Sequence, residues 1–403
     1  MELPWKQKLF YFFPVLFCFC LPFGLRIASF LIAAWTVTSF FNIDKRSIWQ
    51  GFKSQGLLLL HLFFLLTLIS AGLSLNKQEA AFGLEIKLSF VFFPYLFFCF
   101  SWPVEILKRC IVSFVSGCFF ASVYLLVRAF YYSLNGQPEY FFYTLFSSLI
   151  HASYFAMYLV MAIVIVVLFY NKWFSSQRTV LVSSYFFVAV FVITIFLCSS
   201  KLGIISFFIC MPLLVLYKWR RNLTVKRALL CLVGLTVFMF LSFKLFPGSF
   251  NRMNSITSVP ATIDKTSAES TKVRILIWQQ SLQIIKEHFL FGTGVGDGND
   301  ALYAAYEQQG MTGAMAHKLN AHNQFFQTFI ALGLVGFILL FLITFGQLIR
   351  GVMKRNVLLF IFSLLIILNF MVESMLQTSA GVLFFTFFFC VFNIVDQKKL
   401  LGA

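Results

Sequence analysis

The chain has 403 residues, of which 60% are hydrophobic and 11% charged, and its formal net charge is +17. A soluble domain of this length could not hide so much apolar surface, so the composition excludes a soluble globular protein. No basic segment is interleaved with aromatics in a polar domain, which excludes a nucleic-acid-binding surface. The composition predicts a polytopic membrane protein that contacts membrane lipids.

Apolar runs recur along the chain, many with the length of about 17–22 residues that an α-helix needs to cross a bilayer. The first run lacks a small-residue cleavage site and a second follows at once, so we expect no cleavable signal peptide. The runs predict an all-α bundle of about twelve transmembrane helices, at Leu9–Leu25, Ile27–Phe41, Leu57–Leu73, Leu88–Phe100, Ile111–Tyr131, Ser153–Tyr170, Val180–Leu197, Leu202–Tyr217, Ala228–Leu245, Gln324–Ile349, Val357–Val372 and Gly381–Val395.

The basic residues predict the orientation, because lysine and arginine gather in cytoplasmic loops. Most of them fall in alternate short loops that hold few acids, at Lys6, Lys8, Lys45, Arg46, Lys53, Lys108, Arg109, Lys172, Arg178, Lys218, Arg220, Arg221, Lys226, Arg227, Arg350, Lys354, Arg355, Lys398 and Lys399. Both termini are therefore expected in the cytoplasm. Residues 1–245 would carry spans one to nine, residues 246–323 a large external loop, and residues 324–403 spans ten to twelve.

The side chains that usually hold metals or cofactors form no recognisable pattern. All nine cysteines lie in or beside apolar runs and none in the long loop, which argues against a disulfide framework or a cysteine metal site. The acids outside the spans show no paired ligand spacing, and no ATP-type phosphate loop occurs. We expect no metal and no cofactor.

The long loop has a helical pattern of its own. Thr266 and Glu269 fit a capping box, and apolar residues repeat at helical spacing after them, which predicts a helix from about Ser267 to Phe289. A second helix is expected from Ala301 to Gln309, capped by Asp300. The apolar stripe of the first helix consists of Val273, Leu276, Ile277, Ile284 and Ile285. The loop is thus expected to lay two helices over the mouth of the bundle.

Arg274 lies on this first helix beside the apolar stripe, and Trp278 shares its face. A guanidinium makes bidentate contacts with phosphate oxygens and stays charged. Arg274 is therefore either a phosphate ligand or a surface residue of an amphipathic helix, and Trp278 is a further candidate for substrate contact. Arg252, also in the loop, is another candidate for substrate binding.

Two other segments are candidates for an anionic group. Lys201 stands between the seventh and eighth spans and either snorkels to the interface or faces an anionic headgroup, which its serine neighbours favour. The run Gly292-Thr293-Gly294-Val295-Gly296-Asp297 follows a helix, which excludes a dinucleotide-binding fingerprint. It is either an ordinary turn or a nest in which Gly294 and Gly296 bind diphosphate through backbone N–H groups.

His322 stands where the loop becomes the tenth span. A helix N-terminus favours the neutral imidazole, which can take a proton from a sugar hydroxyl as a general base. Asn323 and Gln327 are one turn apart and could orient that sugar. The alternative is that the polar segment from Asn320 merely caps the helix. His151, before the sixth span, is interpreted as a hydrated anchor at the outer interface.

Together these features resemble the O-antigen ligase and O-antigen polymerase superfamily of bacterial envelopes. The resemblance is carried by the twelve-span layout with its late external loop, Ser199-Ser200-Lys201-Leu202-Gly203, Arg274 with Trp278, Gly292-Thr293-Gly294-Val295-Gly296, and Ala321-His322-Asn323-Gln324 leading into Leu332-Gly333-Leu334-Val335-Gly336. It covers most of the chain and is strongest from Ser199 to Gly336.

The resemblance implies an inner-membrane glycosyltransferase with its active site on the periplasmic side, independent of metal and nucleotide sugar. Such ligases move a glycan from undecaprenyl diphosphate to lipid A-core, and polymerases move it to a growing glycan. The family's essential arginine and histidine would fall on Arg274 and His322. Lys201 replaces a second family arginine, which keeps the charge but loses the bidentate fork.

A ligase fits the overall pattern better than a polymerase. A polyprenyl-glycan flippase is a third reading, from a different class of protein. It would spread charged residues along a cavity at membrane depth and show comparable repeat halves. This chain instead has one asymmetric loop and charges at its ends, which favours an enzyme.

The orientation is directly testable. We expect a cysteine introduced as Ser258→Cys to react with a membrane-impermeant maleimide added outside the inner membrane. A cysteine introduced as Lys354→Cys should react only after the membrane is permeabilised. Labelling of Ser258→Cys from the cytoplasmic side alone would overturn the topology.

Overall fold

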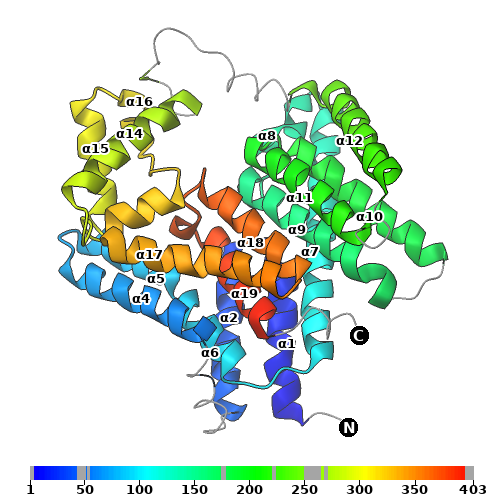
Figure 1. The fold of residues 1–403 in the computed structure, drawn as a ribbon, viewed down its shortest axis with the longest axis horizontal. Helices are drawn as coiled ribbons and strands as arrows, with labels where there is room; N and C mark the ends of the chain where they lie inside the picture. Colours follow the sequence, from blue (N-terminus) through cyan, green and yellow to red (C-terminus); the bar gives the residue numbers. More distant parts are fainter. Residues whose placement is uncertain are drawn as a thin grey trace.

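The structure is a computed structural model that describes residues 4–42, 51, 55–173, 178–219, 224–248, 265–266 and 271–394. Within these ranges every regular element is a helix (Figure 1). The α-helices are α1 (Trp5–Cys20), α2 (Leu25–Ser39), α4 (Gln55–Leu73), α5 (Lys77–Lys87), α6 (Ser89–Phe98), α7 (Val104–Leu134), α8 (Tyr143–Phe146), α9 (Ala152–Trp173), α10 (Arg178–Leu197), α11 (Lys201–Trp219), α12 (Val225–Leu245), α14 (Thr271–Glu287), α15 (Gly298–Gln308), α16 (Thr312–Ala316), α17 (Gln324–Met353), α18 (Val357–Phe370) and α19 (Ser379–Ile394). Short 3-10 turns are η1 (Phe40–Asn42), η2 (Pro138–Phe141) and η3 (Met375–Gln377).

The described helices make this a multi-pass membrane protein. Among the described residues, six helical stretches are long and apolar enough to cross a membrane: Gly56–Leu73, Lys77–Phe98, Val104–Leu134, Ala152–Phe169, Lys201–Lys218 and Gln324–Met353. Four shorter apolar helices are Val182–Leu197, Thr236–Leu245, Val357–Phe370 and Ser379–Ile394. The all-α prediction is confirmed for this part of the chain, and the number of twelve spans stays a prediction.

Helix lengths depart from the expected spans at the N-terminal end. The helices α1 and α2 have 16 and 15 residues, which gives about 24 and 22 Å at 1.5 Å per residue. Both are shorter than the hydrocarbon core of about 30 Å. By contrast α7 has 31 residues and extends beyond the predicted Ile111–Tyr131 at both ends.

The centre of the bundle is built around α9 and α19, whose side chains are mostly buried. Tyr158 of α9 stacks on Phe384 of α19 with ring centroids 4.6 Å apart. Its hydroxyl donates to the Ala380 carbonyl at 2.7 Å, which satisfies the polar end of this buried ring. Phe388 packs edge-on against Phe114 of α7 at 4.8 Å. Many of the phenylalanines thus pack between helices.

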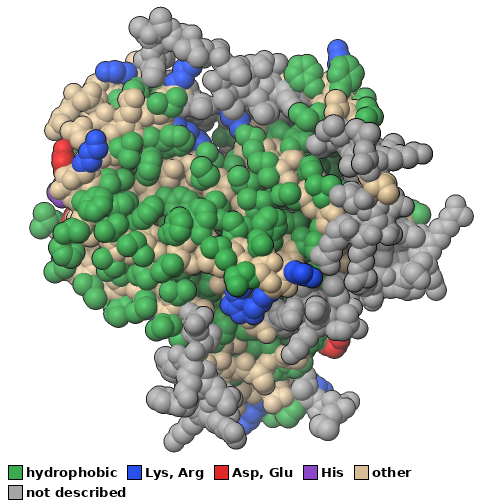
Figure 2. Space-filling view, in the orientation of Figure 1, with side chains coloured by type: hydrophobic (Ala, Val, Ile, Leu, Met, Phe, Trp, Pro, Cys, Tyr) green, Lys and Arg blue, Asp and Glu red, His purple; other side chains and the backbone are tan. Residues whose placement is uncertain are grey.

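Other apolar side chains face outward. Figure 2 shows them gathered over the middle of one face, where α4 and α17 lie in Figure 1. The exposed residues of these helices include Leu58, Leu62, Leu65, Val335, Ile338 and Phe341. Soluble proteins rarely expose so large an apolar patch. We interpret this face as the surface that contacts lipid.

Helices α14, α15 and α16 form a small layer of their own beyond α17 (Figure 1). Their shared core contains the predicted stripe residues Val273, Ile277, Ile284 and Ile285 together with Leu302 and Tyr306. The helix expected over Ser267–Phe289 is observed as Thr271–Glu287, and residues 267–270 and the stretch 249–264 lie outside the described residues. The helices expected in the long loop are therefore present and packed on the bundle.

The predicted cap of the second loop helix was wrong. Helix α15 begins at Gly298, three residues before the expected start, so that Asp297 occupies the N-cap position and Asp300 lies in the first turn. The Asp297 carboxylate makes no cap bond there. It accepts instead from the backbone N–H groups of Leu75 and Asn76 at 2.9 and 2.8 Å, where α5 begins. This contact fastens the loop to the α4–α5 connection.

Helix α17 is broken at Gly333, whose φ of 62° and ψ of −160° are not helical. In an unbroken helix the Ile330 carbonyl would accept from Leu334 N–H. Here it accepts from Thr293 N–H at 2.7 Å, and Leu334 N–H donates to the Phe289 carbonyl at 2.9 Å. Phe289 and the glycine-rich turn that follows α14 thus supply partners for backbone groups that the break releases.

Gly333 should tolerate no side chain. A Cβ atom there would collide with the Leu290 carbonyl, and the left-handed conformation alone costs a non-glycine residue about 1–3 kcal/mol. We expect Gly333→Ala to lower the thermal midpoint of the detergent-solubilised protein clearly. Gly346→Ala is the control, because it lies in the same helix with nothing within 4 Å of its Cβ. Equal midpoints for both variants would contradict this account of the break.

Candidate functional site

A mostly buried carboxylate, Glu373, lies just beyond the end of α18, and its side chain is 14% exposed. Arg274 of α14 reaches it: Nη2 lies 3.2 Å from Oε1, and Nη1 donates to the Val372 carbonyl at 2.9 Å. Val372 lies two residues beyond the last residue of α18, directly before Glu373. Arg274 therefore pairs with the carboxylate and also binds the backbone of the segment that carries it.

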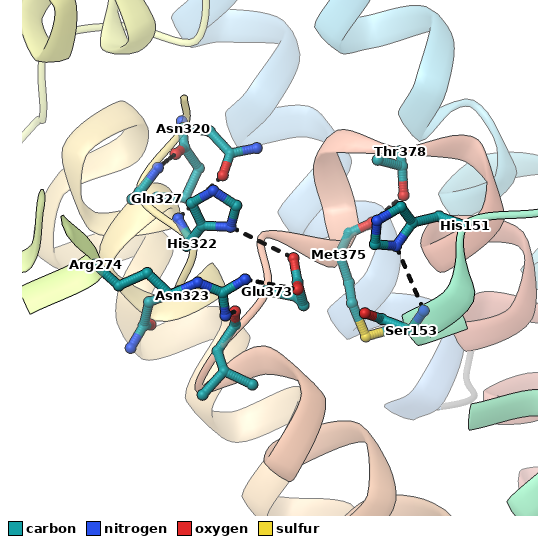
Figure 3. Close-up of polar contacts among 12 residues, drawn as sticks. His151, Ser153, Arg274, Asn320, His322, Asn323, Gln327, Glu373, Met375 and Thr378 are labelled. Carbon is teal, nitrogen blue, oxygen red and sulfur yellow. Dashed lines mark hydrogen bonds and ion pairs between the residues drawn. The ribbon is translucent and has the colours of Figure 1, made fainter. Parts of the chain in front are cut away.

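His322 faces the other oxygen of the same carboxylate (Figure 3). Its Nδ1 is 3.5 Å from Glu373 Oε2, and its side chain is 20% exposed. The residue has a φ of 45°, a left-handed conformation that is uncommon for a side chain of this size. Its N–H donates to Asn320 Oδ1 at 3.0 Å. The backbone is thus bent so that the ring faces Glu373.

The electrostatics favour an ionised Glu373. Burial raises the pKa of its carboxyl, but the His322 ring, the Arg274 guanidinium and His151 together lower it below the ordinary value of 4.5. An ionised carboxylate beside Nδ1 favours the tautomer with the proton on Nδ1. The Nε2 atom of His322 is then a proton acceptor.

Three of the side chains predicted to contact substrate hold the segment that carries His322, and their contact with substrate stays a prediction. Trp278 Nε1 donates to the Ala321 carbonyl at 3.1 Å, and Gln327 Oε1 accepts from Ala321 N–H at 2.9 Å. Asn323 is the N-cap of α17: its Oδ1 accepts from the N–H groups of Phe325 and Phe326, and its Nδ2 donates to the Met371 carbonyl at 3.1 Å. Capping is therefore part of this motif, and these side chains position His322.

The glycine-rich turn has protein partners for its N–H groups. Gly294 N–H donates to the Ala331 carbonyl at 3.1 Å, and Gly296 N–H donates to Ser74 Oγ at 3.0 Å. A phosphate nest needs such groups directed at the ligand. Contact of Gly294 and Gly296 with substrate stays a prediction, but the observed role of both residues is to dock the turn on α4 and on the broken α17.

Lys201 and Arg252 are the two remaining candidates for substrate binding. Lys201 is the first residue of α11 and is half-buried. It follows Ser200, whose Oγ lies 3.3 Å from Ser153 Oγ at the start of α9. Arg252 lies outside the described residues, so its predicted role is carried no further.

The sequence does not single out Glu373 and His151 as functional residues. Glu373 shows no ligand spacing with another acid, yet an isolated acid at the end of an apolar run is a signal in itself, because such residues are costly near the membrane. His151 was interpreted as an interfacial anchor. It is exposed, but it lies close enough to act on the charge of Glu373.

The cluster can therefore do acid–base chemistry next to a cation. It combines the Glu373 carboxylate, the His322 ring oriented by that carboxylate, and the Arg274 guanidinium, which has five N–H donors in all. Over the described ranges, no three histidine, cysteine or acidic side chains converge in a way that could hold a metal ion.

One family model matches part of the chain. The family model described as O-Antigen ligase matches residues 186–341. That range contains Lys201, Arg274 and His322, and Glu373 and His151 lie outside it. The resemblance to the O-antigen ligase-like superfamily is thereby confirmed. No curated protein matched the chain.

The pairing of Glu373 predicts a pH-dependent stability. Because its pKa is lower in the folded protein, the ionised carboxylate favours folding above the unfolded-state pKa, and this contribution is lost as pH falls through the folded-state value. We expect Glu373→Gln to lower the thermal midpoint at pH 7, with the difference from wild type shrinking as pH falls below about 4.5.

The control for this experiment is Glu105→Gln. Glu105 forms an ion pair with Lys108 at 2.8 Å, but its side chain is 72% exposed, and exposed pairs contribute little to stability. If both variants showed the same small change at every pH, Glu373 would not be held as a buried carboxylate.

Proposed function

We propose that this O-antigen ligase-like membrane protein transfers a glycan from undecaprenyl diphosphate to lipid A-core. The observation that carries the proposal is the cluster of Arg274, Glu373 and His322. It joins a helix of the loop to the ends of α17 and α18 at the side of the bundle where the loop helices pack. On this proposal the site faces the periplasm, and the protein resides in the bacterial inner membrane.

His322 acts as the general base. Glu373 stays ionised beside Nδ1, which keeps its proton, and Nε2 takes the proton of the acceptor hydroxyl as that oxygen attacks the anomeric carbon. The bond from this carbon to the diphosphate oxygen breaks, and its electron pair leaves with undecaprenyl diphosphate. This single displacement inverts the anomeric centre. A positioned base typically contributes about 10²–10⁴-fold in rate.

The diphosphate leaves readily when cations hold it, so the mechanism needs no general acid. Arg274 uses one N–H on Glu373 and one on Val372, and a guanidinium has five N–H donors in all. Those that remain are available to a phosphate oxygen, and Lys201 supplies a second cation. We propose that the reaction uses neither metal nor nucleotide sugar, so EDTA should not inhibit it.

A polymerase would use the same donor and the same base and would differ in the acceptor, a growing glycan. The two functions are separated by the glycan profile of a deletion strain. Loss of all long glycan from lipid A-core, with polymer accumulating on the polyprenyl carrier, identifies a ligase. Single repeat units on the core identify a polymerase.

Variants of the cluster test the mechanism in that strain and with purified protein. We expect Arg274→Ala to abolish transfer and His322→Ala to reduce it by about 10²–10⁴-fold, when activities are compared at equal amounts of folded protein in the membrane. Lys286→Ala removes an exposed cation from the same helix α14 and should complement fully. The product of the purified enzyme should have the inverted anomeric configuration by NMR. Retained configuration, inhibition by EDTA or an active His322→Ala protein would contradict the mechanism.

A further inference from the structure

The segment that joins α18 to α19 carries Glu373 and is held on both flanks by side chains from the start of α17. Asn323 Nδ2 donates to the Met371 carbonyl at 3.1 Å, two residues before Glu373. Gln324 Oε1 accepts from Leu376 N–H at 2.6 Å, three residues after it. Because these two side chains directly follow the histidine of the site, their bonds join the backbone beside that histidine to the backbone around the carboxylate.

Gln324 is enclosed by protein, with 1% of its surface exposed. Its Nε2 donates to Thr328 Oγ1 at 2.9 Å, one turn further along α17. A backbone N–H can only donate, so the amide oxygen must be the atom that faces Leu376, and the amide nitrogen is left for the Thr328 hydroxyl. Both ends of this buried amide therefore have protein partners, and its role lies in the arrangement of the chain rather than in contact with substrate.

Other bonds hold the segment before Glu373 and at Glu373 itself. The Glu373 N–H donates to the Asn369 carbonyl of α18 at 2.9 Å, and Arg274 donates to the Val372 carbonyl at 2.9 Å. Beyond Glu373 the chain enters η3, and Gln324 provides a bond that ties η3 to α17. Removing this bond would release the far side of the segment from the helix that follows the histidine.

The contact between His322 and Glu373 is sensitive to such a release. Nδ1 of His322 lies 3.5 Å from Glu373 Oε2, which is the outer limit of a hydrogen bond. A small displacement of the carboxylate therefore decides whether the contact is made. With the contact, the carboxylate selects the tautomer that carries its proton on Nδ1, and without it both tautomers are open to the neutral ring.

We propose that Gln324 is a positioning residue, whose bond to Leu376 N–H holds the Glu373 carboxylate beside His322 Nδ1. Gln324 touches neither donor nor acceptor and acts through the tautomer of the base. Its effect on glycan transfer rests on the proposed function, whereas its effect on the His322 ring requires no transfer. A residue that only stabilised the fold would change stability and leave the ring as it is.

Three substitutions separate these two roles. Gln324→Met keeps an unbranched chain of similar length but offers Leu376 N–H no oxygen. Gln324→Glu keeps one oxygen for Leu376 N–H and another for the Thr328 hydroxyl, and an acid is favourable in the first turn of a helix. Gln324→Asn keeps the amide on a chain one methylene shorter, which withdraws its oxygen from Leu376. It is the second test if Gln324→Met does not fold.

The first measurement is nitrogen NMR of the full-length protein in nanodiscs, prepared with isotope-labelled histidine. The His322 signals are identified by their loss in His322→Ala, and their chemical shifts report which nitrogen of the neutral ring carries the proton. We expect the proton on Nδ1 in wild type and in Gln324→Glu. Gln324→Met and Gln324→Asn should show a mixture of both tautomers.

The second measurement is transfer by the purified enzyme. We expect kcat to fall by about 10- to 100-fold in Gln324→Met, because a misplacement of about 1 Å at a reacting group can cost that much. Gln324→Glu should restore most of the rate. The KM values for donor and acceptor should stay unchanged, because the substitution removes an aid to the chemical step and no contact with substrate.

The control is Asn356→Ala, at the opposite end of α18. Asn356 is 6% exposed and caps that helix, its Oδ1 accepting from Leu359 N–H at 3.0 Å. Its loss should lower the thermal midpoint, since N-caps stabilise helices. The His322 tautomer and kcat should stay at their wild-type values, which separates a loss of stability from a loss of positioning.

A wild-type ring with its proton on Nε2, or a wild-type tautomer in both Gln324→Met and Gln324→Asn, would overturn the inference. The same would follow if Asn356→Ala changed the tautomer as much as Gln324→Met, because stability alone would then control the ring. If wild type transferred no glycan but the tautomer still depended on Gln324, the proposed function would fail and the inference would stand.

Discussion

The carboxylate of Glu373 lies just beyond the carboxyl end of α18, where a negative charge is electrostatically unfavourable. Helix carbonyls already concentrate negative charge there, and burial adds a desolvation cost. The charge is tolerated because Arg274 comes from α14, His322 from the segment before α17 and His151 from the segment before α9. These segments lie far apart in the sequence and meet at one buried acid. The packing of the loop helices on the bundle is therefore coupled to the ionisation of the site.

The break in α17 serves the same arrangement through the backbone. A helix that stops and restarts leaves N–H and C=O groups that must find partners where water is scarce. The glycine-rich turn provides partners for Ile330 and Ala331, and the Phe289 carbonyl just before it provides one for Leu334. Glycine is needed at Gly292 because a Cβ there would lie 2.6 Å from Gly333 N and the Ile330 carbonyl oxygen. The turn thereby docks the end of α14 on α17, and the start of α17 carries the His322 segment. Residues that look like a phosphate cradle in the sequence are used to hold a helix break.

The sequence predicts the features that depend on apolar periodicity and run length, namely helices and their buried faces, and these agree with the structure. Apolar runs gave most helices, and the stripe of Val273 and Ile277 gave the buried face of α14. The resemblance placed Arg274 and His322 in one site. The sequence could not show distant partners: the side-chain amides of Asn323 and Gln327 bond Met371, Ala321 and Asn299, and contact of these two residues with substrate stays a prediction. Glu373 could not be predicted as a site residue, because its partners come from other segments of the chain and produce no spacing pattern in the sequence.

The position of Glu373 separates two tasks of the proposed transfer reaction, proton acceptance and stabilisation of the leaving diphosphate. Of the atoms that meet here, His322 Nε2 must accept a proton from a nucleophile, whereas the groups around the leaving diphosphate must offer positive charge. A carboxylate beside the base helps the first task and opposes the second, so the two tasks have to lie on different sides of it. Arg274 pairs with this carboxylate, so that its own positive charge is largely offset. The proposed chemistry therefore needs further cations, such as Lys201, to stabilise the leaving diphosphate, and these have to lie away from the carboxylate.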